Sequence, residues 1–531
     1  MGNNHLEILN TIIYLGEINP KRLINEFEEK ILSLKDPELS YCFAKNVKGA
    51  NIKAHEQVVI DSKNLQYNYY FAKDIKDADI KAHGKVIIES KNLLSNDYFA
   101  SIPGADVKAH GKVIIESKDP HFNYLFATSI EGADIKAHSK VVLESKDLQY
   151  NYYFAGVPGA DVEAHINVVI ESKDPYYNYL LAKDIPNIDI KKCAQIVIDS
   201  NNLEYNYEFA RNVDGSDVKA HGKVIIESKD LTMNYYFAKN VPGADIEAHG
   251  DVILESKDLD WIYEFAKNIP NIDIKKYSQG IIDSKNPEYN YKFAQDIKGT
   301  DIRAHGQAII ESQNLKYNCL FAKEIKGADV RAHGQAIIES KDLQYNYWFA
   351  KDIKGADVVA HGKVIIDSKD PEYNYKFAKD VKGADVLAHG QVIIENGTAE
   401  DNYLFALYVK GANIKAHEKA IIDSGDAEYN CKFASAILDS DIDAHGQVII
   451  KSGDSRYIYS FVRYVLGSDA DIKPYEQALL ANRDAEYSDL FMRYIKGADI
   501  EKHLEVINQY SKAEEYDSYA SNLRLLLENR K

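Results

Sequence analysis

The stretch GADVKAHGKVIIES, residues 104–117, decides the fold because copies of it return along almost the whole 531-residue chain. Successive copies lie 27 or 28 residues apart, with one step of 30 residues before the copy at Tyr475. Self-similarity at such a period is typical of stacked-repeat proteins. Three of the seventeen copies carry Cys193, Tyr277 or Tyr475 where the other fourteen carry histidine. The fourteen are His55, His83, His110, His138, His165, His221, His249, His305, His333, His361, His389, His417, His445 and His503.

The residues that punctuate each repeat predict two helices joined by a tight turn. Asp119 followed by Pro120 is a favourable helix start, because proline has no N–H that the first turn would leave unpaired. Gly132 suits the left-handed position that ends this first helix. Asp134 can cap the second helix, and all seventeen repeats have Asp or Asn there. Each repeat is therefore expected to hold two helices of roughly 12 residues.

Apolar residues recur at helical spacing within each repeat. Phe122, Phe126 and Ile130 follow one another at four-residue intervals in the first helix, and Val107 and Ile114 lie on one side of a second helix. One helix pair cannot bury both apolar stripes alone, whereas stacked neighbours bury them continuously. We therefore predict an all-α fold, an α-solenoid superhelix of about seventeen two-helix repeats.

The predicted repeats occupy residues 36–503, between an N-terminal helical cap at 1–35 and a C-terminal helical cap at 504–531. This architecture resembles that of the HEAT, armadillo and TPR repeat proteins, although a 28-residue unit is shorter than theirs and lacks the TPR consensus. The units are also similar to tandem repeats of uncharacterised bacterial proteins. The resemblance to solenoid families implies a binding scaffold.

A longer period is visible above the single repeat. The segments NIDIKKCAQIVIDS (187–200) and NIDIKKYSQGIIDS (271–284) depart from their neighbours in the same way and lie 84 residues apart. Three repeats of 28 residues make up that distance. The pattern indicates that a three-repeat block has been duplicated.

Composition narrows the classes of partner and the compartment. A net charge of −18 disfavours binding to a phosphate backbone, whose protein footprint is usually basic. The four cysteines are widely spaced, without CxxC pairs, which predicts reduced thiols in the cytoplasm. No stretch approaches the ~20 apolar residues that span a bilayer. We therefore expect a soluble cytoplasmic protein that does not bind membranes.

Two polar positions recur along the chain and invite a chemical interpretation. Equivalent histidines of neighbouring repeats should lie ~8–10 Å apart, the distance between packed helices, which is too far to share a metal ion. His110 falls between Val107 and Ile114 on the apolar side, so a packed core histidine is favoured over a pH-sensitive or ligand-facing one. The amide at Asn68, Asn123, Asn346 and ten equivalent positions barely varies, which favours a structural role over reading a partner.

The position just before the core phenylalanine varies freely and is expected to face away from the core. It holds Tyr70, Tyr153, Tyr236 and Trp348 in four of the repeats. Exposed aromatic side chains concentrate binding energy, so these four are candidate partner contacts. Packing between repeats, or a face that is simply solvated, is the alternative explanation for them.

No enzyme motif interrupts the repeats, so we expect a non-enzyme that needs neither cofactor nor metal. The leading hypothesis is a scaffold that binds a protein or peptide along a groove of the solenoid. A solenoid that binds nucleic acid is a second possibility, although the net charge disfavours it. A third is an acidic decoy that inhibits a nucleic-acid-binding protein.

Overall fold

The computed structural model describes residues 7–8, 10–14 and 21–510, and all regular secondary structure in these ranges is helical. Helices α3 to α36 form seventeen consecutive pairs, in agreement with the seventeen repeats of the sequence. The chain divides into two compact units, Met1–Ser256 and Lys257–Lys531, which are described separately. The first helix of each pair is called an A helix here and the second a B helix.

The first unit contains α2 and eight pairs. Helix α2 spans Lys21–Leu34. The A helices are α3 (Pro37–Asn46), α5 (Leu65–Asp74), α7 (Leu93–Ala100), α9 (Pro120–Ser129), α11 (Leu148–Phe154), α13 (Pro175–Asp184), α15 (Leu203–Asn212) and α17 (Leu231–Asn240). The B helices are α4 (Ile52–Ser62), α6 (Ile80–Ser90), α8 (Val107–Ser117), α10 (Ile135–Ser145), α12 (Val162–Ser172), α14 (Ile190–Asp199), α16 (Val218–Ser228) and α18 (Ile246–Ser256).

The second unit contains nine pairs. Its A helices are α19 (Leu259–Asn268), α21 (Pro287–Asp296), α23 (Leu315–Glu324), α25 (Leu343–Asp352), α27 (Pro371–Asp380), α29 (Ala399–Tyr408), α31 (Ala427–Ala436), α33 (Ser455–Tyr464) and α35 (Ala485–Tyr494). Its B helices are α20 (Ile274–Asp283), α22 (Ile302–Glu311), α24 (Val330–Ser340), α26 (Val358–Ser368), α28 (Val386–Asn396), α30 (Ile414–Ser424), α32 (Ile442–Ser452), α34 (Lys473–Ala481) and α36 (Ile500–Tyr510).

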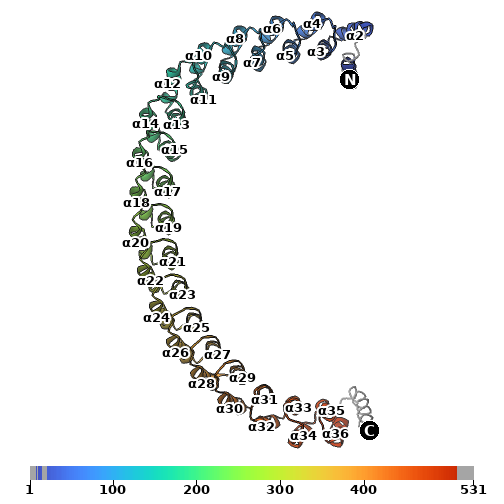
Figure 1. The fold of residues 1–531 in the computed structure, drawn as a ribbon, viewed down its shortest axis with the longest axis vertical. Coiled ribbons are helices and arrows are strands. Elements are labelled where there is room, and N and C mark those ends of the chain that lie inside the picture. The colour runs from blue at the N-terminus through green and yellow to red at the C-terminus, as the bar shows by residue number, and fades with distance from the viewer. Residues whose placement is uncertain (1–6, 9, 15–20, 511–531) are drawn as a thin grey trace. The chain divides into compact units, whose positions relative to one another are not determined.

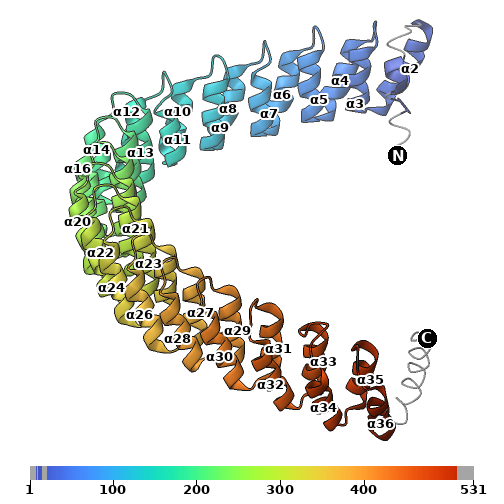
Figure 2. The same cartoon turned by 60° about the horizontal axis from the view of Figure 1, so that its bottom comes forward.

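Within each unit the helices stand in two adjacent rows, and the A helices form the inner row of the curve (Figure 1). Neighbouring A helices lie side by side along their row, as do neighbouring B helices (Figure 2). The surface presented by the A helices is called the A face. It is the surface that a partner lying inside the curve of either unit would meet.

The predicted caps explain where the helices begin and end. The Asp119 carboxylate accepts from the N–H of Phe122 and begins α9, and Asp134 accepts from the N–H of Ala137 and begins α10. Gly132 between them has a φ of +81°, which favours glycine. Most helices are 10 or 11 residues long, slightly shorter than the expected 12. Helix α34 departs from the pattern, because it begins one residue later, after Ile472, and Asp471 accepts from the N–H of Lys473 instead.

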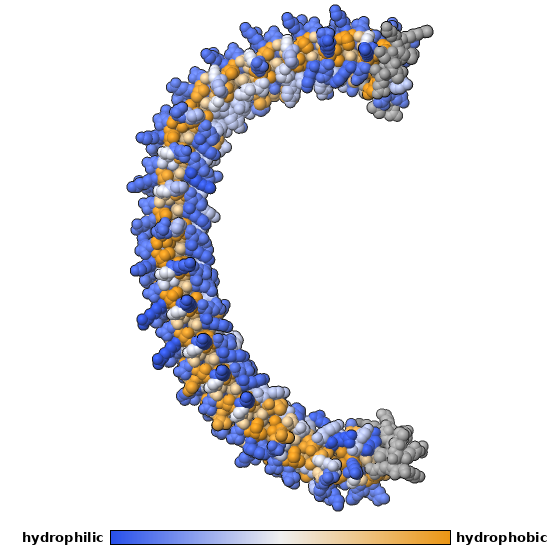
Figure 3. All heavy atoms as spheres, in the orientation of Figure 1, coloured by the Kyte–Doolittle hydropathy of each residue, from blue (hydrophilic) through white to orange (hydrophobic). Residues whose placement is uncertain are grey.

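The core of each repeat lies between the two rows of helices. Phe126 and Ile130 of one repeat pack with Ile114 on the preceding B helix and with Ala100 on the preceding A helix, and all four side chains are buried. Apolar residues accordingly form a band between the rows, with hydrophilic residues on either side (Figure 3). Stacking therefore buries the apolar stripes that a single repeat would leave exposed.

The B helices commonly end on a residue in the left-handed conformation. Lys118, for example, has a φ of 60° at the end of α8, and Lys341 has a φ of 58° at the end of α24. Gly425 and Gly453 take the same place after α30 and α32. A side chain with a Cβ atom is strained there, whereas glycine is not.

The described residues include part of each predicted cap. Helix α2 belongs to the predicted cap at 1–35, and its Ile24 and Ile31 are buried against Phe43 of the first repeat. Residues 504–510 of the predicted C-terminal cap continue α36, while 511–531 lie outside the described residues. Within the described ranges, no helix combines the length and apolar character that crossing a bilayer requires.

Candidate binding face

The repeated asparagine joins three helices. In the fourth repeat, Nδ2 of Asn123 on α9 donates to the carbonyl of Ile114 on the preceding B helix at 3.0 Å and to the carbonyl of Asp119 at 2.8 Å. Its Oδ1 accepts from Nδ1 of His138 on α10 at 2.7 Å. Twelve repeats have this Asn–His hydrogen bond, with distances of 2.7–2.8 Å. The asparagine is thereby satisfied inside the protein and is not available to a partner.

The histidines of these twelve pairs are buried in the neutral form. Asn123 accepts the Nδ1 proton of His138, so the other ring nitrogen, Nε2, carries the lone pair. In repeats such as the third, Nε2 of His110 lies against Gly84 of the preceding B helix, where a Cβ would come within 3.2 Å of it. Burial lowers the pKa of His110 and of His138 to about 4. Glycine thus admits the ring of the next repeat, and no hydrogen-bond donor faces Nε2 of His110.

His83, His221, His305 and His333 are buried at the positions equivalent to those of His110 and His138. All six are at most 1% exposed, and the rings of His83 and His110 contact Phe71 and Phe99 with centroid distances of 5.1 Å. Asn68, Asn123 and Asn346 are fully buried. The structure therefore places both the recurring histidines and the recurring asparagines in the interior, away from the surfaces that a partner can reach.

Two of the five exceptional repeats change the asparagine and the histidine together, whereas Ser40 and Ser488 replace the asparagine alone, before His55 and His503. Where tyrosine replaces histidine, at Tyr277 and Tyr475, isoleucine replaces asparagine, at Ile262 and Ile458. Where Cys193 replaces the histidine, Asn178 is retained, but its buried Oδ1 has no hydrogen-bond partner. The sequence analysis predicted a structural role for the amide but did not identify the histidine as its partner. The paired substitutions within the chain were the signal that could have revealed it.

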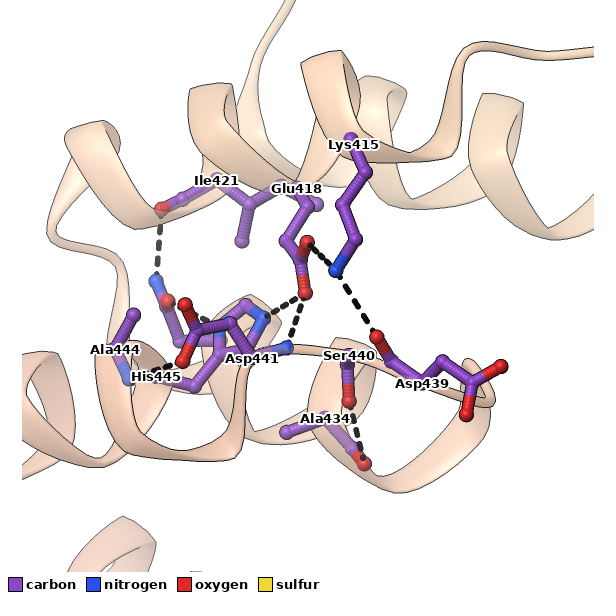
Figure 4. A network of polar contacts seen from close by, with 10 residues as sticks. Lys415, Glu418, Ile421, Ala434, Asp439, Ser440, Asp441, Ala444 and His445 are labelled. Atoms are coloured by element: carbon purple, nitrogen blue, oxygen red, sulfur yellow. Dashed lines mark hydrogen bonds and ion pairs between the residues drawn. The ribbon is translucent and has the colours of Figure 1, made fainter.

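In a few repeats, glutamate replaces the glycine that directly follows the histidine position of the B helix and faces the histidine of the next repeat. Oε1 of Glu418 on α30 accepts from the N–H of Asp441 at 2.5 Å and lies 3.6 Å from Nε2 of His445, while Lys415 approaches Oε2 at 2.8 Å (Figure 4). Glu56 and Glu476 make the same contacts to the following repeat. These networks link B helices to each other. Among the described residues, no three His, Cys, Asp or Glu side chains come together as a metal would require.

Tyrosines link neighbouring A helices on the A face. Tyr347 on α25 donates to Oδ2 of Asp380 on α27 at 2.5 Å, and Nζ of Lys351 donates to the Tyr347 hydroxyl at 2.7 Å. Tyr41 and Tyr263 make the same arrangement with an aspartate of the next A helix and a lysine of their own. Hydrogen bonds from Tyr347 and Lys351 lower the pKa of Asp380. Many charged groups of the A face therefore serve the contacts between repeats.

The four candidate contact residues lie on the A helices, but not all are exposed. Tyr153 is 38% exposed, and Tyr236 and Trp348 are each 44% exposed. The expectation is wrong for Tyr70, which is half-buried because the rings of Tyr41 and Tyr69 lie 5.8 and 5.7 Å from it. One of these rings comes from the neighbouring repeat, a contact that a single helix cannot reveal.

One stretch of the A face lacks the usual charges. Helices α7, α9 and α11 have no acidic residue in the first turn and no basic residue in the last. Leu94 and Tyr98 on α7 are 49% and 54% exposed, and with Tyr69 and Tyr70 they line a groove of about 460 Å³. The inner edge of this stretch is pale in Figure 3. An exposed patch of this kind, rimmed by polar residues, is typical of an interaction site.

Comparison with known proteins adds no family to this description. No family model and no curated protein matches the chain. Among solved structures, the crystal structure of SYS-1 is matched over 94% of this chain and 84% of that chain. The sequence identity is 11% and the TM-score is 0.10, a score too low to support an argument about fold or function.

Proposed function

We propose that the protein is a non-catalytic scaffold that binds a protein or peptide along the A face. One observation carries the proposal. The asparagine and histidine that recur in most repeats are used in hydrogen bonds within the protein, whereas exposed positions of the A helices change from repeat to repeat. A surface whose framework is constant and whose exposed residues vary is suited to recognising an extended partner.

The exposed aromatic residues support a peptide or protein partner in particular. Tyr98, Tyr153, Tyr236 and Trp348 offer large rigid side chains, which contribute strongly to protein interfaces. The net charge of −18 is unfavourable for a nucleic-acid backbone.

The test is capture of partners at low salt by the tagged full-length chain from lysate of the source cells, with mass spectrometry and absorbance at 260 nm. We expect a protein that is lost from the Tyr98→Ser/Tyr153→Ser variant and retained by the Lys112→Ser/Lys140→Ser variant, whose changes lie on B helices. Nuclease-sensitive absorbance at 260 nm would support a nucleic-acid-binding solenoid instead. A nucleic-acid-binding protein captured equally by both variants would support the acidic decoy.

A further inference from the structure

The tyrosine position that links A helices is interrupted once on the stretch formed by α7, α9 and α11. Tyr69 on α5, Tyr124 on α9 and Tyr152 on α11 occupy this position, but α7 has Asp97 there. Aromatic ring contacts run from Tyr69 to Tyr98 on one side and from Tyr124 to Tyr153 on the other. Asp97 stands at the break between these two runs of rings.

Asp97 is a buried carboxylate without a partner. Its residue exposure is 8%, and its buried Oδ1 has no hydrogen-bond partner. Burial raises the pKa of Asp97, as expected for an acid that no cation neutralises. His121, the neighbouring titratable group on α9, directs Nδ1 to the hydroxyl of Tyr150 at 2.7 Å. A buried carboxylate in this state is costly unless a cation reaches it or it becomes protonated.

Asp97 lacks the basic neighbour that the equivalent acid of another repeat has. Asp489 on α35 occupies the same position, and Arg493, four residues later, forms an ion pair with it. The residue four places after Asp97 is Ser101, whose hydroxyl donates to the carbonyl of Tyr98. Elsewhere on the A face, lysines such as Lys351 meet the acids of the next repeat. Within the described residues of α7, α9 and α11, no lysine or arginine occurs that could do so.

We infer that Asp97 anchors the arginine side chain of an extended peptide that lies across the A face of α7, α9 and α11. This inference rests on the proposed function and names the chemistry of the partner. A guanidinium group suits the site because it pairs with a carboxylate through two parallel hydrogen bonds and stacks on aromatic rings. Tyr98 follows Asp97 on α7, and Tyr124 holds the equivalent position on α9. The groove beside Leu94, between α5 and α7, lies at the α7 end of the path of the peptide and accommodates an apolar residue at that end.

The length of the peptide follows from the spacing of the helices. Packed helices lie about 8–10 Å apart, and an extended chain advances about 3.3 Å per residue. About three residues therefore cover each A helix, and a peptide of roughly nine residues crosses α7, α9 and α11. An overall acidic protein favours a peptide that carries positive charge.

The test compares two fluorescein-labelled nonapeptide pools with the full-length protein by fluorescence anisotropy. Eight positions are randomised among Ala, Ser, Leu and Tyr, and the central residue is arginine in one pool and citrulline, its uncharged analogue, in the other. We expect the arginine pool to bind at least tenfold more tightly than the citrulline pool. The Asp97→Asn variant should lose this difference, and the Asp489→Asn variant should keep it.

A second variant guards against an effect of misfolding. Ser101→Arg places an arginine four residues after Asp97, as Arg493 follows Asp489, so the protein's own side chain should occupy the site. We expect this variant to lose the preference for arginine while its melting temperature stays unchanged or rises. Equal binding of both pools that depends on Tyr98 and Tyr153 would overturn the arginine site but leave the scaffold proposal standing. Absence of binding by both pools, or a preference that survives in both the Asp97 variant and the Ser101 variant, would also overturn the site.

Discussion

The interior of each repeat is specified by a small number of polar contacts. Asn123 connects α8, α9 and α10 through three hydrogen bonds, and the ring of His138 fills the space that Gly111 leaves open. A buried donor or acceptor that loses its partner destabilises a protein by about 1–3 kcal/mol. Each member of the network should therefore be sensitive to change by itself and tolerant of change together with its partner.

Substitution of the pair by the residues found in other repeats tests this coupling. We expect Asn123→Ile and His138→Tyr each to lower the free energy of unfolding by about 2 kcal/mol, because each leaves a buried polar group unpaired. The double variant should recover at least about 1 kcal/mol of the summed loss, since it recreates the Ile262 and Tyr277 combination. Denaturant unfolding of the four proteins gives the coupling energy. Strictly additive effects of the two substitutions would contradict the coupling between Asn123 and His138.

Much of this interior could be predicted from the sequence, but periodicity alone does not reveal which side chains are partners. The spacing of Val107 and Ile114 around His110 was enough to predict a buried histidine. The partner of His110 lies fourteen residues earlier, at Asn96, across a turn whose geometry periodicity does not define. Tyr70 was expected to be exposed because projection onto one helix cannot include the ring of Tyr41 from the adjacent repeat.

At the scale of helices, glycine positions decide how closely neighbouring B helices approach. A Cβ at Gly111 would lie 3.1 Å from the ring of Phe126 and 3.3 Å from His138, a crowding that small shifts relieve. At Gly446 the hydroxyl of Tyr475 occupies the same space, and a Cβ would lie only 1.9 Å from it. The larger tyrosine thus depends on glycine more strictly than histidine does.

Alanine substitutions measure that difference. Alanine gains about 1 kcal/mol of helix propensity over glycine, which offsets the mild crowding at Gly111. We expect Gly111→Ala to change the free energy of unfolding by less than about 1 kcal/mol. Gly446→Ala should destabilise by about 1–3 kcal/mol because Tyr475 must move. Thermal unfolding of both variants is the measurement, and an equal effect of the two would argue against the close approach of Tyr475 to Gly446.

The ends of the B helices offer a stabilising change. Lys341 has a φ of 58°, a conformation that is unfavourable by roughly 1–2 kcal/mol for residues with a Cβ atom. Glycine relieves this strain but loses more entropy on folding, so Lys341→Gly should stabilise by about 0.5–1 kcal/mol. The control is Lys363→Gly inside α26, which should destabilise by about 1 kcal/mol. Chemical denaturation would contradict the prediction if both variants lost stability.

At the scale of the whole molecule, the buried histidines add up to a dependence on pH. Burial lowers the pKa of His110 to about 4, and it does the same for most of the recurring histidines. A histidine in the unfolded chain has a pKa near 6.5. A base whose folded pKa is lowered stabilises the fold above the unfolded pKa. That stability is lost as the pH falls from about 6.5 toward 4, because only the unfolded chain takes up the proton.

We therefore expect the protein to be markedly less stable at pH 5 than at pH 7. The loss is up to about 2 kcal/mol for each histidine within a cooperatively unfolding segment. Guanidinium denaturation followed by circular dichroism at both pH values measures it. The Asn123→Ile/His138→Tyr variant has one titrating histidine fewer and should show a smaller decrease. A denaturation midpoint that does not change between pH 7 and pH 5 would contradict this account.

The hydrogen bonds of Asn123 reach back only one B helix and forward only to His138, and this short reach bears on the history of the gene. Removal of residues 119–146 would join Lys118 to Asp147 and bring Asn151 to the carbonyl of Ile114, which Asn123 occupies now. Recombination between misaligned copies can thus add or delete whole units without leaving an unpaired group behind. The number of units, and with it the length of the A face, is free to change between generations while every remaining unit still folds.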